Sequence, residues 1–308
     1  MLYGALAANL GIAIAKFAAA AISDSSSMLT EGVHSLVDSG NQLLLLYGQH
    51  RAKKRPDQFH PFGYGRELYF WAFVVAILIF AVGAGVSIYE GIVHVQAPEP
   101  LRDPTINYVV LAVAIALEGT SWAIAVKEFN AKRGTGRWWE SVKSSKDPAG
   151  FMVLFEDSAA LIGLGFAAIG IWASHHYGDA RFDGYASIAI GVVLAVVAIL
   201  LARESKGLII GESADPALIK QIGDAIAARP EISCVNHVRT VHTAPEAVFV
   251  AISADFADDL LMGDAERLIE EMEALLKAMS PNIASIYIRP EKRADATAIT
   301  LGRPGEGE

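Results

Sequence analysis

The sequence contains one cysteine, Cys234, among 308 residues, and charged residues are scarce over most of its length. A single cysteine excludes an internal disulfide and a CxxC metal site, so we expect Cys234 to be a packed core thiol. The net charge is −9, and no Lys/Arg cluster is interleaved with aromatic residues, which argues against nucleic acid as a partner. The first apolar stretch begins at residue 2 and is too long for a signal peptide, so we expect no cleavable signal.

Long apolar runs make up the first two thirds of the sequence. Hydrophobic residues are 53% of the chain and the mean hydropathy is +0.37, which is high for a soluble protein. Runs nearly free of charge recur as far as residue 203, which indicates an α-helical membrane protein. Six segments are long enough to span a bilayer: 2–22, 28–49, 68–95, 106–127, 149–174 and 183–203. The sequence therefore predicts a six-helix transmembrane bundle over residues 1–204, with the lipid bilayer as its surroundings.

Positive residues occur mainly in alternate links between these segments. The link after the second segment carries Arg51, Lys53, Lys54, Arg55 and Arg66. The link after the fourth carries Lys127, Lys132, Arg133, Arg137, Lys143 and Lys146. Each of the other links carries at most one. The positive-inside rule then predicts cytoplasmic basic links and cytoplasmic N- and C-termini. From the compact loops and the lack of a transit peptide we expect a bacterial inner membrane.

Charged residues return at ordinary density in the last third of the chain, from about Arg203 onward. The segment "DPALIKQIGDAIAARP" reads as a helix with Asp215 as its N-cap. Two strand-like runs, a second amphipathic helix over 262–279 and a last strand follow. This αββαβ order predicts a small cytoplasmic α+β domain over residues 205–293. We expect residues 294–308 to be a disordered tail.

Four polar residues occur in the second apolar segment, within "EGVHSLVDSGNQ". On a helix, Glu31, His34, Asp38 and Asn41 fall within a strip about 80° wide. Ionisable groups inside a membrane span are costly, so they usually face the bundle interior and have a function there. The fifth segment adds an adjacent acidic pair, Glu156 and Asp157.

The spacing of these residues suits a divalent metal ion. His34 and Asp38 are four residues apart, so an imidazole and a carboxylate reach one ion from adjacent helical turns. One nitrogen with carboxylates from two helices favours Zn²⁺ over Mg²⁺ or Ca²⁺. The alternative is that these residues only make hydrogen bonds between helices, with Glu31 as a helix cap and Asn41 as an interhelical amide. For Lys16 and Glu118, in the first and fourth segments, we expect an internal ion pair or snorkelling to a helix end.

Four motifs in this order resemble the cation diffusion facilitator family. They are "HSLVD" (34–38), "HPFGYGRE" (60–67), "FEDSAALIG" (155–163) and "LIIGESAD" (208–215). The resemblance covers nearly the whole chain. It implies six spans followed by a cytoplasmic metallochaperone-like domain. It also implies a homodimeric metal/proton antiporter, not an enzyme, that exports Zn²⁺ or a related ion from the cytoplasm in exchange for protons.

The resemblance also implies a set of metal ligands. The typical family motifs are (H/D)xxxD in span two and HxxxD in span five, and His34, Asp38 and Asp157 match three of these four positions. Val153 stands at the fourth and has no donor atom. The chain is similar here to an atypical branch that has an adjacent Glu-Asp pair and includes mitochondrial zinc exporters of animals. Glu156 is the candidate for the missing ligand, with Asn41 or a water as alternatives.

The identity of the ion stays open at this point. A ligand set with fewer nitrogen and more oxygen atoms shifts the metal preference of the site from Zn²⁺ towards Mn²⁺, Fe²⁺ or Co²⁺. A second open question is whether the chain transports metal at all, because a membrane-anchored metal sensor or scaffold is another class of protein with such a site. The polar strip deep in a span favours transport, since a sensor would keep its ligands in the soluble domain.

Two further metal sites of the family are incomplete in this sequence. Asp57 and His60 match two ligands of an accessory site, but Tyr64 stands where a third ligand is often a histidine. A structured cytoplasmic loop is the alternative for this segment. In the C-terminal domain the usual ligand positions hold Asn236, Ser253 and Tyr287. We expect His237 and His242 there to be surface residues.

Overall fold

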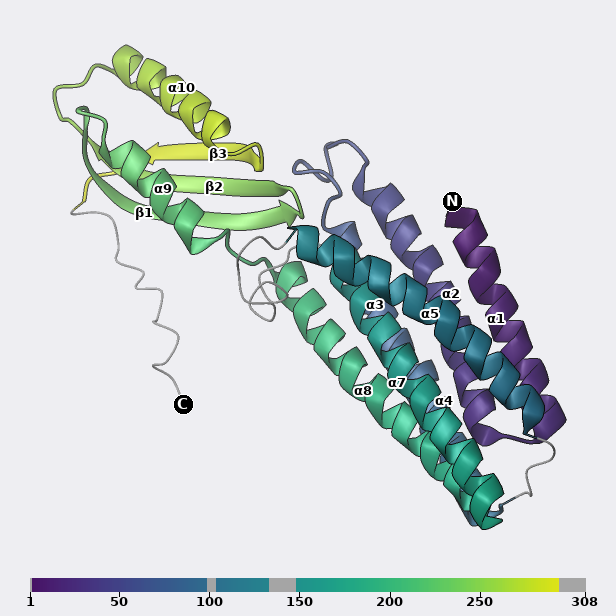
Figure 1. Cartoon of the computed structure of the whole chain (residues 1–308). Helices are drawn as coiled ribbons and strands as arrows, with labels where there is room; N and C mark the ends of the chain where they lie inside the picture. Colours follow the sequence, from purple (N-terminus) through teal and green to yellow (C-terminus); the bar gives the residue numbers. More distant parts are fainter. Residues whose placement is uncertain (1, 99–103, 133–147, 294–308) are drawn as a thin grey trace, which may run out of the picture. The chain divides into compact units, whose positions relative to one another are not determined.

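The computed structural model describes residues 2–98, 104–132 and 148–293. The chain divides into two compact units, Met1–Ile209 and Ile210–Glu308, and each is described by itself (Figure 1). Part of the second predicted basic link, from Arg133 to Lys146, and the predicted tail, 294–308, lie outside the described residues.

The first unit consists of long helices that run alongside one another (Figure 1). Its elements in chain order are α1 (Leu2–Ser23), α2 (Ser26–Ala52), α3 (Glu67–Leu78), η1 (Ile79–Ala84), α4 (Gly85–Gln96), α5 (Thr105–Lys132), α7 (Pro148–Tyr177) and α8 (Arg181–Ile210). Elements α3, η1 and α4 form one continuous helix with a π-helical turn in the middle. Such turns put one extra residue into a helix and often occur at functional sites.

Four helices of the described residues are long and apolar enough to cross a membrane. They are Glu67–Gln96, Thr105–Ala131, Gly150–Tyr177 and Arg181–Ile210. Residues Asn9–Ser23 of α1 form a shorter apolar helix. Helix α2 has 27 residues, but the polar strip and its basic C-terminal end lower its hydropathy. The chain is thus a helical membrane protein, and the count of six spans stays a prediction.

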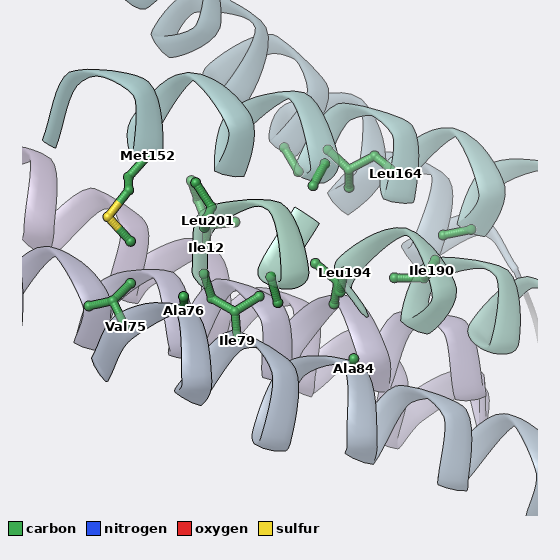
Figure 2. Close-up of a cluster of buried hydrophobic side chains, with 14 of the residues drawn as sticks. Ile12, Val75, Ala76, Ile79, Ala84, Met152, Leu164, Ile190, Leu194 and Leu201 are labelled. Carbon is green, nitrogen blue, oxygen red and sulfur yellow. The ribbon is translucent and has the colours of Figure 1, made fainter. Parts of the chain in front are cut away.

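The core of the helical unit is aliphatic and connects several helices (Figure 2). Val75, Ala76 and Ile79 of α3 and η1 pack in the same cluster as residues from α7 and α8, such as Leu164 and Leu194. Helices α4 and α8 approach especially closely at a pair of glycines. A Cβ added to Gly91 would lie 2.7 Å from the carbonyl oxygen of Gly184. Small residues at such crossings let helix backbones touch, which is typical of packing inside membranes.

A buried carboxylate ties the α1–α2 turn to α8. Ser25, the N-cap of α2, donates its hydroxyl to Asp183 at 3.0 Å, and the backbone N–H of Ser27 donates to Asp183 at 3.1 Å. The Ser27 hydroxyl also donates to this carboxylate. Ser26 and Ser187 are hydrogen bonded at 2.8 Å. This hydroxyl-rich network fixes where α2, which carries the polar strip, begins.

The second unit is a three-stranded sheet with two helices. Its elements are α9 (Pro216–Ala227), β1 (Ile232–Ala244), β2 (Ala247–Phe256), α10 (Met262–Met279) and β3 (Ile283–Pro290). The strand order is β1-β2-β3, with β1 and β2 antiparallel and β2 and β3 parallel. Figure 1 shows α9 and α10 packed over the sheet. The helix α9 begins as expected, with Asp215 accepting a hydrogen bond from the Ala217 N–H.

The core of this unit lies between the sheet and its helices. Val248, Val250 and Ile252 alternate along β2 and are buried against Ile222 of α9 and Met272 of α10. This small apolar core accounts for the compactness of the second unit.

Two expectations about the second unit are wrong. Cys234 is half-buried rather than part of the core. His242 is only 7% exposed rather than a surface residue, because β1 continues past it and pairs it with Val248.

Candidate metal centre

Helix α2 places the polar strip inside the bundle. The side chains of Glu31 and Asn41 are completely buried, and that of His34 is 2% exposed. The Nε2 atom of His34 lies 3.5 Å from Oδ2 of Asp38, one helical turn further on. The i, i+4 spacing therefore brings the imidazole and the carboxylate together on the inner face of α2.

A small polar cavity lies between α2, α5 and α7, with Asn9 of α1 at its edge. Its volume is about 10 Å³, which is about the room that one water molecule needs. The residues that line it are Asn9, Ser35, Asp38, Gln42, Glu118, Val153, Glu156 and Asp157. Carboxyl groups of α2, α5 and α7 thus line one cavity, and carboxylate oxygens are suitable ligands of a divalent cation.

Two hydrogen bonds hold the acidic pair of α7. Asn41 donates its amide N–H to Oε1 of Glu156 at 3.0 Å. The hydroxyl of Ser121 on α5 donates to Oδ2 of Asp157 at 2.8 Å. The two adjacent acids therefore have different neighbours, with Glu156 held from α2 and Asp157 from α5.

Each residue of the strip has one buried side-chain atom that makes no hydrogen bond within the described part of the chain. These atoms are Oε1 of Glu31, Nε2 of His34, Oδ1 of Asp38 and Oδ1 of Asn41. Buried polar atoms are usually satisfied, so such atoms indicate a missing partner. Lone pairs of an imidazole, a carboxylate and an amide are all suitable metal ligands.

The described conformation does not yet form a coordination shell. Among residues 2–98, 104–132 and 148–293, no three His, Cys, Asp or Glu side chains converge closely enough to hold an ion. The cavity brings Asp38, Glu156 and Asp157 together, while His34 reaches it through Asp38.

The structure adds one acid that the sequence did not assign to the site. Glu118 of α5 lines the cavity beside Asp157 and is half-buried. The sequence does show that Glu118 is an ionisable residue in the middle of an apolar segment, which suggests a role inside the bundle. It does not show that α5 packs against α7, so Glu118 could not be assigned to this cavity. Val153, which has no donor atom, lies on the cavity wall.

A buried ion pair lies next to the strip. The Lys16 ammonium is 2.9 Å from Oε2 of Glu31 and 2.8 Å from the hydroxyl of Ser35. Lys16 therefore forms the internal ion pair, and it does not snorkel to a helix end. Glu31 is a member of this pair rather than a cap, because Ser25 caps α2.

In the loop between α2 and α3, the Asp57 carboxylate accepts hydrogen bonds from three other loop residues. Its Oδ1 accepts the backbone N–H groups of Phe59 and His60 at 2.9 and 2.8 Å, and its Oδ2 accepts the Tyr64 hydroxyl at 2.6 Å. These hydrogen bonds lower the pKa of Asp57, and the bond from the Tyr64 hydroxyl has the largest effect. Nδ1 of His60 lies 3.4 Å from Oδ1 of Asp57. These hydrogen bonds give the loop a defined structure. Binding of a metal ion by Asp57 and His60 stays a prediction.

Two of the three family ligand positions of the second unit, Asn236 and Ser253, belong to one hydrogen-bonded group. Asn236 donates to the Ser253 hydroxyl at 3.1 Å and to the carbonyl oxygen of Glu291 at 2.8 Å. Ser253 donates to the Glu291 carboxylate at 2.7 Å. Tyr287 is 62% exposed and its ring lies 5.4 Å from that of Phe249. Asn236 and Ser253 are thus bonded to each other, in place of a shared ion.

The first unit coincides with a known domain. The family model described as the cation efflux transmembrane domain matches residues 2–210. This match covers more than half of the 308 residues.

Curated proteins of several organisms are similar to this chain. The "Proton-coupled zinc antiporter SLC30A9, mitochondrial" of Xenopus laevis is 30% identical over 75% of this chain and 42% of its own length. The "Metal tolerance protein C4" of Arabidopsis thaliana is 31% identical over 68% of this chain and 47% of its own length. The "Cation-efflux pump FieF" of Escherichia coli O127:H6 is 24% identical over 83% of this chain and 80% of its own length. The chain therefore spans less than half the length of the first two relatives.

Proposed function

Because this chain belongs to the cation efflux family, whose members are metal transporters of the membrane, we propose that it exports Zn²⁺ in exchange for protons through the cavity between α2, α5 and α7. The observation that carries the proposal is the cavity itself. Acids of α2, α5 and α7 line it, and His34 lies beside it, with Nε2 3.5 Å from Asp38 and without a hydrogen bond among the described residues. Helical packing alone does not need this many ionisable groups in one place.

The ligands in this proposal are His34, Asp38 and Asp157, with Glu156 as the fourth. Asn41 then acts on Glu156 through the hydrogen bond between them, as a residue that positions the carboxylate. Each of these carboxylates, and the imidazole, binds either a proton or the metal ion at a given lone pair. Metal entry therefore releases protons, and this competition couples the two fluxes.

A homodimer in the bilayer completes the proposal, with both termini and the basic α2–α3 loop on the cytoplasmic side. The predicted bacterial inner membrane fits this arrangement. The mitochondrial relatives place similar chains in an organelle, so the proposal requires only that metal leave the compartment that holds the basic loop.

The numbers of nitrogen and oxygen ligand atoms at the cavity favour a second group of candidate ions. Only one nitrogen, from His34, stands beside a cavity whose other donors are oxygens, and such a set suits Mn²⁺, Fe²⁺ or Co²⁺ as well as Zn²⁺. Competition of each ion with Zn²⁺ for uptake separates the two candidates.

The experiment is metal uptake by vesicles that contain the purified chain and have an acidic interior. We expect Zn²⁺ to accumulate, and we expect accumulation to stop when an ionophore removes the proton gradient. Binding of Zn²⁺ without flux in either condition would identify a sensor or scaffold and contradict the proposal. Zn²⁺ uptake at the same rate with and without the proton gradient would support transport and contradict exchange for protons.

A further inference from the structure

The loop between α2 and α3, residues 53–66, lies where the chain meets the membrane surface. Helix α2 ends at Ala52, and the apolar helix that begins with α3 starts at Glu67. The two ends of the loop are joined, because Nη2 of Arg51 lies 2.7 Å from Oε1 of Glu67. Since Glu67–Gln96 is long and apolar enough to cross a membrane, the loop that precedes it lies close to the bilayer surface.

This loop carries an excess of positive charge in a chain whose net charge is −9. Its basic residues are Lys53, Lys54, Arg55 and Arg66, and its one acidic residue is Asp57. All four basic residues are exposed. Asp57 uses both carboxylate oxygens for hydrogen bonds within the loop. The charge that the loop presents to its surroundings is therefore mainly positive.

The same loop presents two phenylalanine side chains. Phe59 is 87% exposed, which is the highest value among the large apolar side chains of the described residues, and Phe62 is 53% exposed. Hydrogen bonds hold the backbone at these positions. The Phe59 N–H donates to Oδ1 of Asp57 at 2.9 Å, and the Gly63 N–H donates to the carbonyl oxygen of His60 at 2.9 Å. An ordered turn thus carries exposed apolar side chains close in sequence to exposed basic ones.

This combination fits the surface of a membrane leaflet that contains anionic lipids. Lys and Arg side chains are attracted to anionic headgroups, and aromatic side chains enter the boundary between headgroups and acyl chains. Each Lys or Arg near such a surface favours binding about fivefold. A protein surface rich in carboxylates would match the charge as well, but the bilayer is the surface that the neighbouring apolar helix brings next to the loop.

We propose that Lys53, Lys54 and Arg55, together with Phe59, form a docking surface for the anionic phospholipids of the leaflet on their side of the membrane. The basic residues bind the headgroup phosphates, and Phe59 enters the apolar boundary below them. The inference requires the chain to be a membrane protein, and it does not depend on the proposed export of metal.

Arg181 provides a matched control at the other end of the helical unit. Ser26, at the start of α2, and Ser187, near the start of α8, are hydrogen bonded at 2.8 Å. Helices α2 and α8 therefore begin at the same end, whereas the loop follows the last residue of α2 (Figure 1). Arg181 is the first residue of α8 and is exposed, so it tests a single basic residue far from the loop.

The first test measures contact between the loop and lipid in the full-length chain. Cys234, the one cysteine, is replaced by serine, and an environment-sensitive fluorophore is attached through Gln58→Cys, an exposed position next to Phe59. The labelled chain is reconstituted into mixed vesicles of phosphatidylcholine and phosphatidylglycerol, with one or the other lipid brominated. We expect stronger quenching by brominated phosphatidylglycerol, and we expect high salt to reduce the difference. Equal quenching by the two lipids at low salt would overturn the inference.

The second test removes the basic residues. Lys53→Gln/Lys54→Gln/Arg55→Gln should lower the excess quenching by phosphatidylglycerol at least about fivefold, whereas Arg181→Gln should leave it unchanged. Arg55→Gln alone covers the case in which the triple variant does not fold. An unchanged excess in the triple variant or, where that variant does not fold, in Arg55→Gln would contradict the docking surface. So would an equal loss in Arg181→Gln.

A third test separates the apolar contribution. Phe59→Ser should weaken quenching by both brominated lipids, because the loop then lies further from the acyl chains. Phe59→Leu should keep the quenching, since leucine also favours an apolar surrounding. Quenching that is the same in Phe59→Ser and Phe59→Leu would exclude Phe59 from the docking surface.

Carbodiimide treatment of the same vesicles tests for a protein partner instead of lipid, because it joins Lys side chains to carboxylates in contact with them. We expect Lys53 and Lys54 to form no cross-link with the second unit or with another copy of the chain. Such a cross-link, identified by mass spectrometry, would show that protein covers the loop and would overturn the inference.

Discussion

The ammonium of Lys16 lies 2.9 Å from Oε2 of Glu31, and both side chains are completely buried in the helical unit. The pair joins α1 to α2, and Ser35 accepts a second hydrogen bond from the ammonium. Ser35 also lines the metal centre, next in sequence to His34. Lys16 therefore fixes the inner face of α2 where the proposed ligands begin.

The first prediction concerns this ion pair. Lys16→Met removes the ammonium and leaves the Glu31 carboxylate buried without its partner, which should cost about 3–5 kcal/mol. Lys16→Met/Glu31→Gln removes both charges and should recover much of the loss. The thermal midpoint of the detergent-solubilised chain measures both effects. A double variant less stable than Lys16→Met would contradict the account.

The second prediction uses the backbone of α7 beside Glu31. A Cβ added to Gly163 would lie 2.5 Å from Oε1 of Glu31, so Gly163→Ala should displace the carboxylate and lower both stability and metal uptake. Gly165→Ala is the matched control, because a Cβ there meets nothing within 4 Å. The control should be neutral, or more stable by up to about 1 kcal/mol, since alanine favours the helix. Equal uptake by the two variants would show that this contact has no role.

The third prediction concerns pH and the loop after α2. The Tyr64 hydroxyl is the main cause of the lowered pKa of Asp57, so Tyr64→Phe should raise that pKa towards about 3.9. A lowered carboxyl pKa means that the loop gains stability above the unfolded pKa and loses it as pH falls through the folded pKa. Titration of Asp57 by NMR in wild type and Tyr64→Phe measures the shift. Tyr47→Phe, in α2, is the control and should leave Asp57 unchanged.

The fourth prediction concerns the second unit. Asn236 and Ser253 are hydrogen bonded to each other and to Glu291, so the fragment 205–293 should fold and dimerise without metal. Calorimetry should detect no tight stoichiometric binding of Zn²⁺. Tight binding by this fragment would place a metal site where the structure has a hydrogen-bond network.

Local patterns in the sequence predicted those features that depend on neighbours along one helix or strand. The i, i+4 spacing of His34 and Asp38 places their side chains 3.5 Å apart. The alternation of Val248, Val250 and Ile252 gives β2 one buried face. Both follow from the periods of the helix and the strand, which are fixed by backbone geometry.

Features that depend on which elements pack together could not be predicted. Lys16 had two possible roles until α1 was seen beside α2, and Glu118 joins the cavity only because α5 packs against α7. The periodicity of apolar residues identifies the buried face of a helix, but it does not identify the neighbouring helix that this face contacts. The burial of His242 depends in the same way on its pairing with β2.

The central claim is that an ion crosses the membrane through the cavity lined by Asp38, Glu156 and Asp157. The measurement that tests it most directly is Zn²⁺ uptake by Asp157→Ala and wild type in matched acidic vesicles, with equal amounts of folded, inserted protein. We expect wild-type uptake to be abolished in Asp157→Ala, because the cavity then loses a carboxylate that an ion needs. Zn²⁺ uptake by Asp157→Ala at the wild-type rate would contradict the claim.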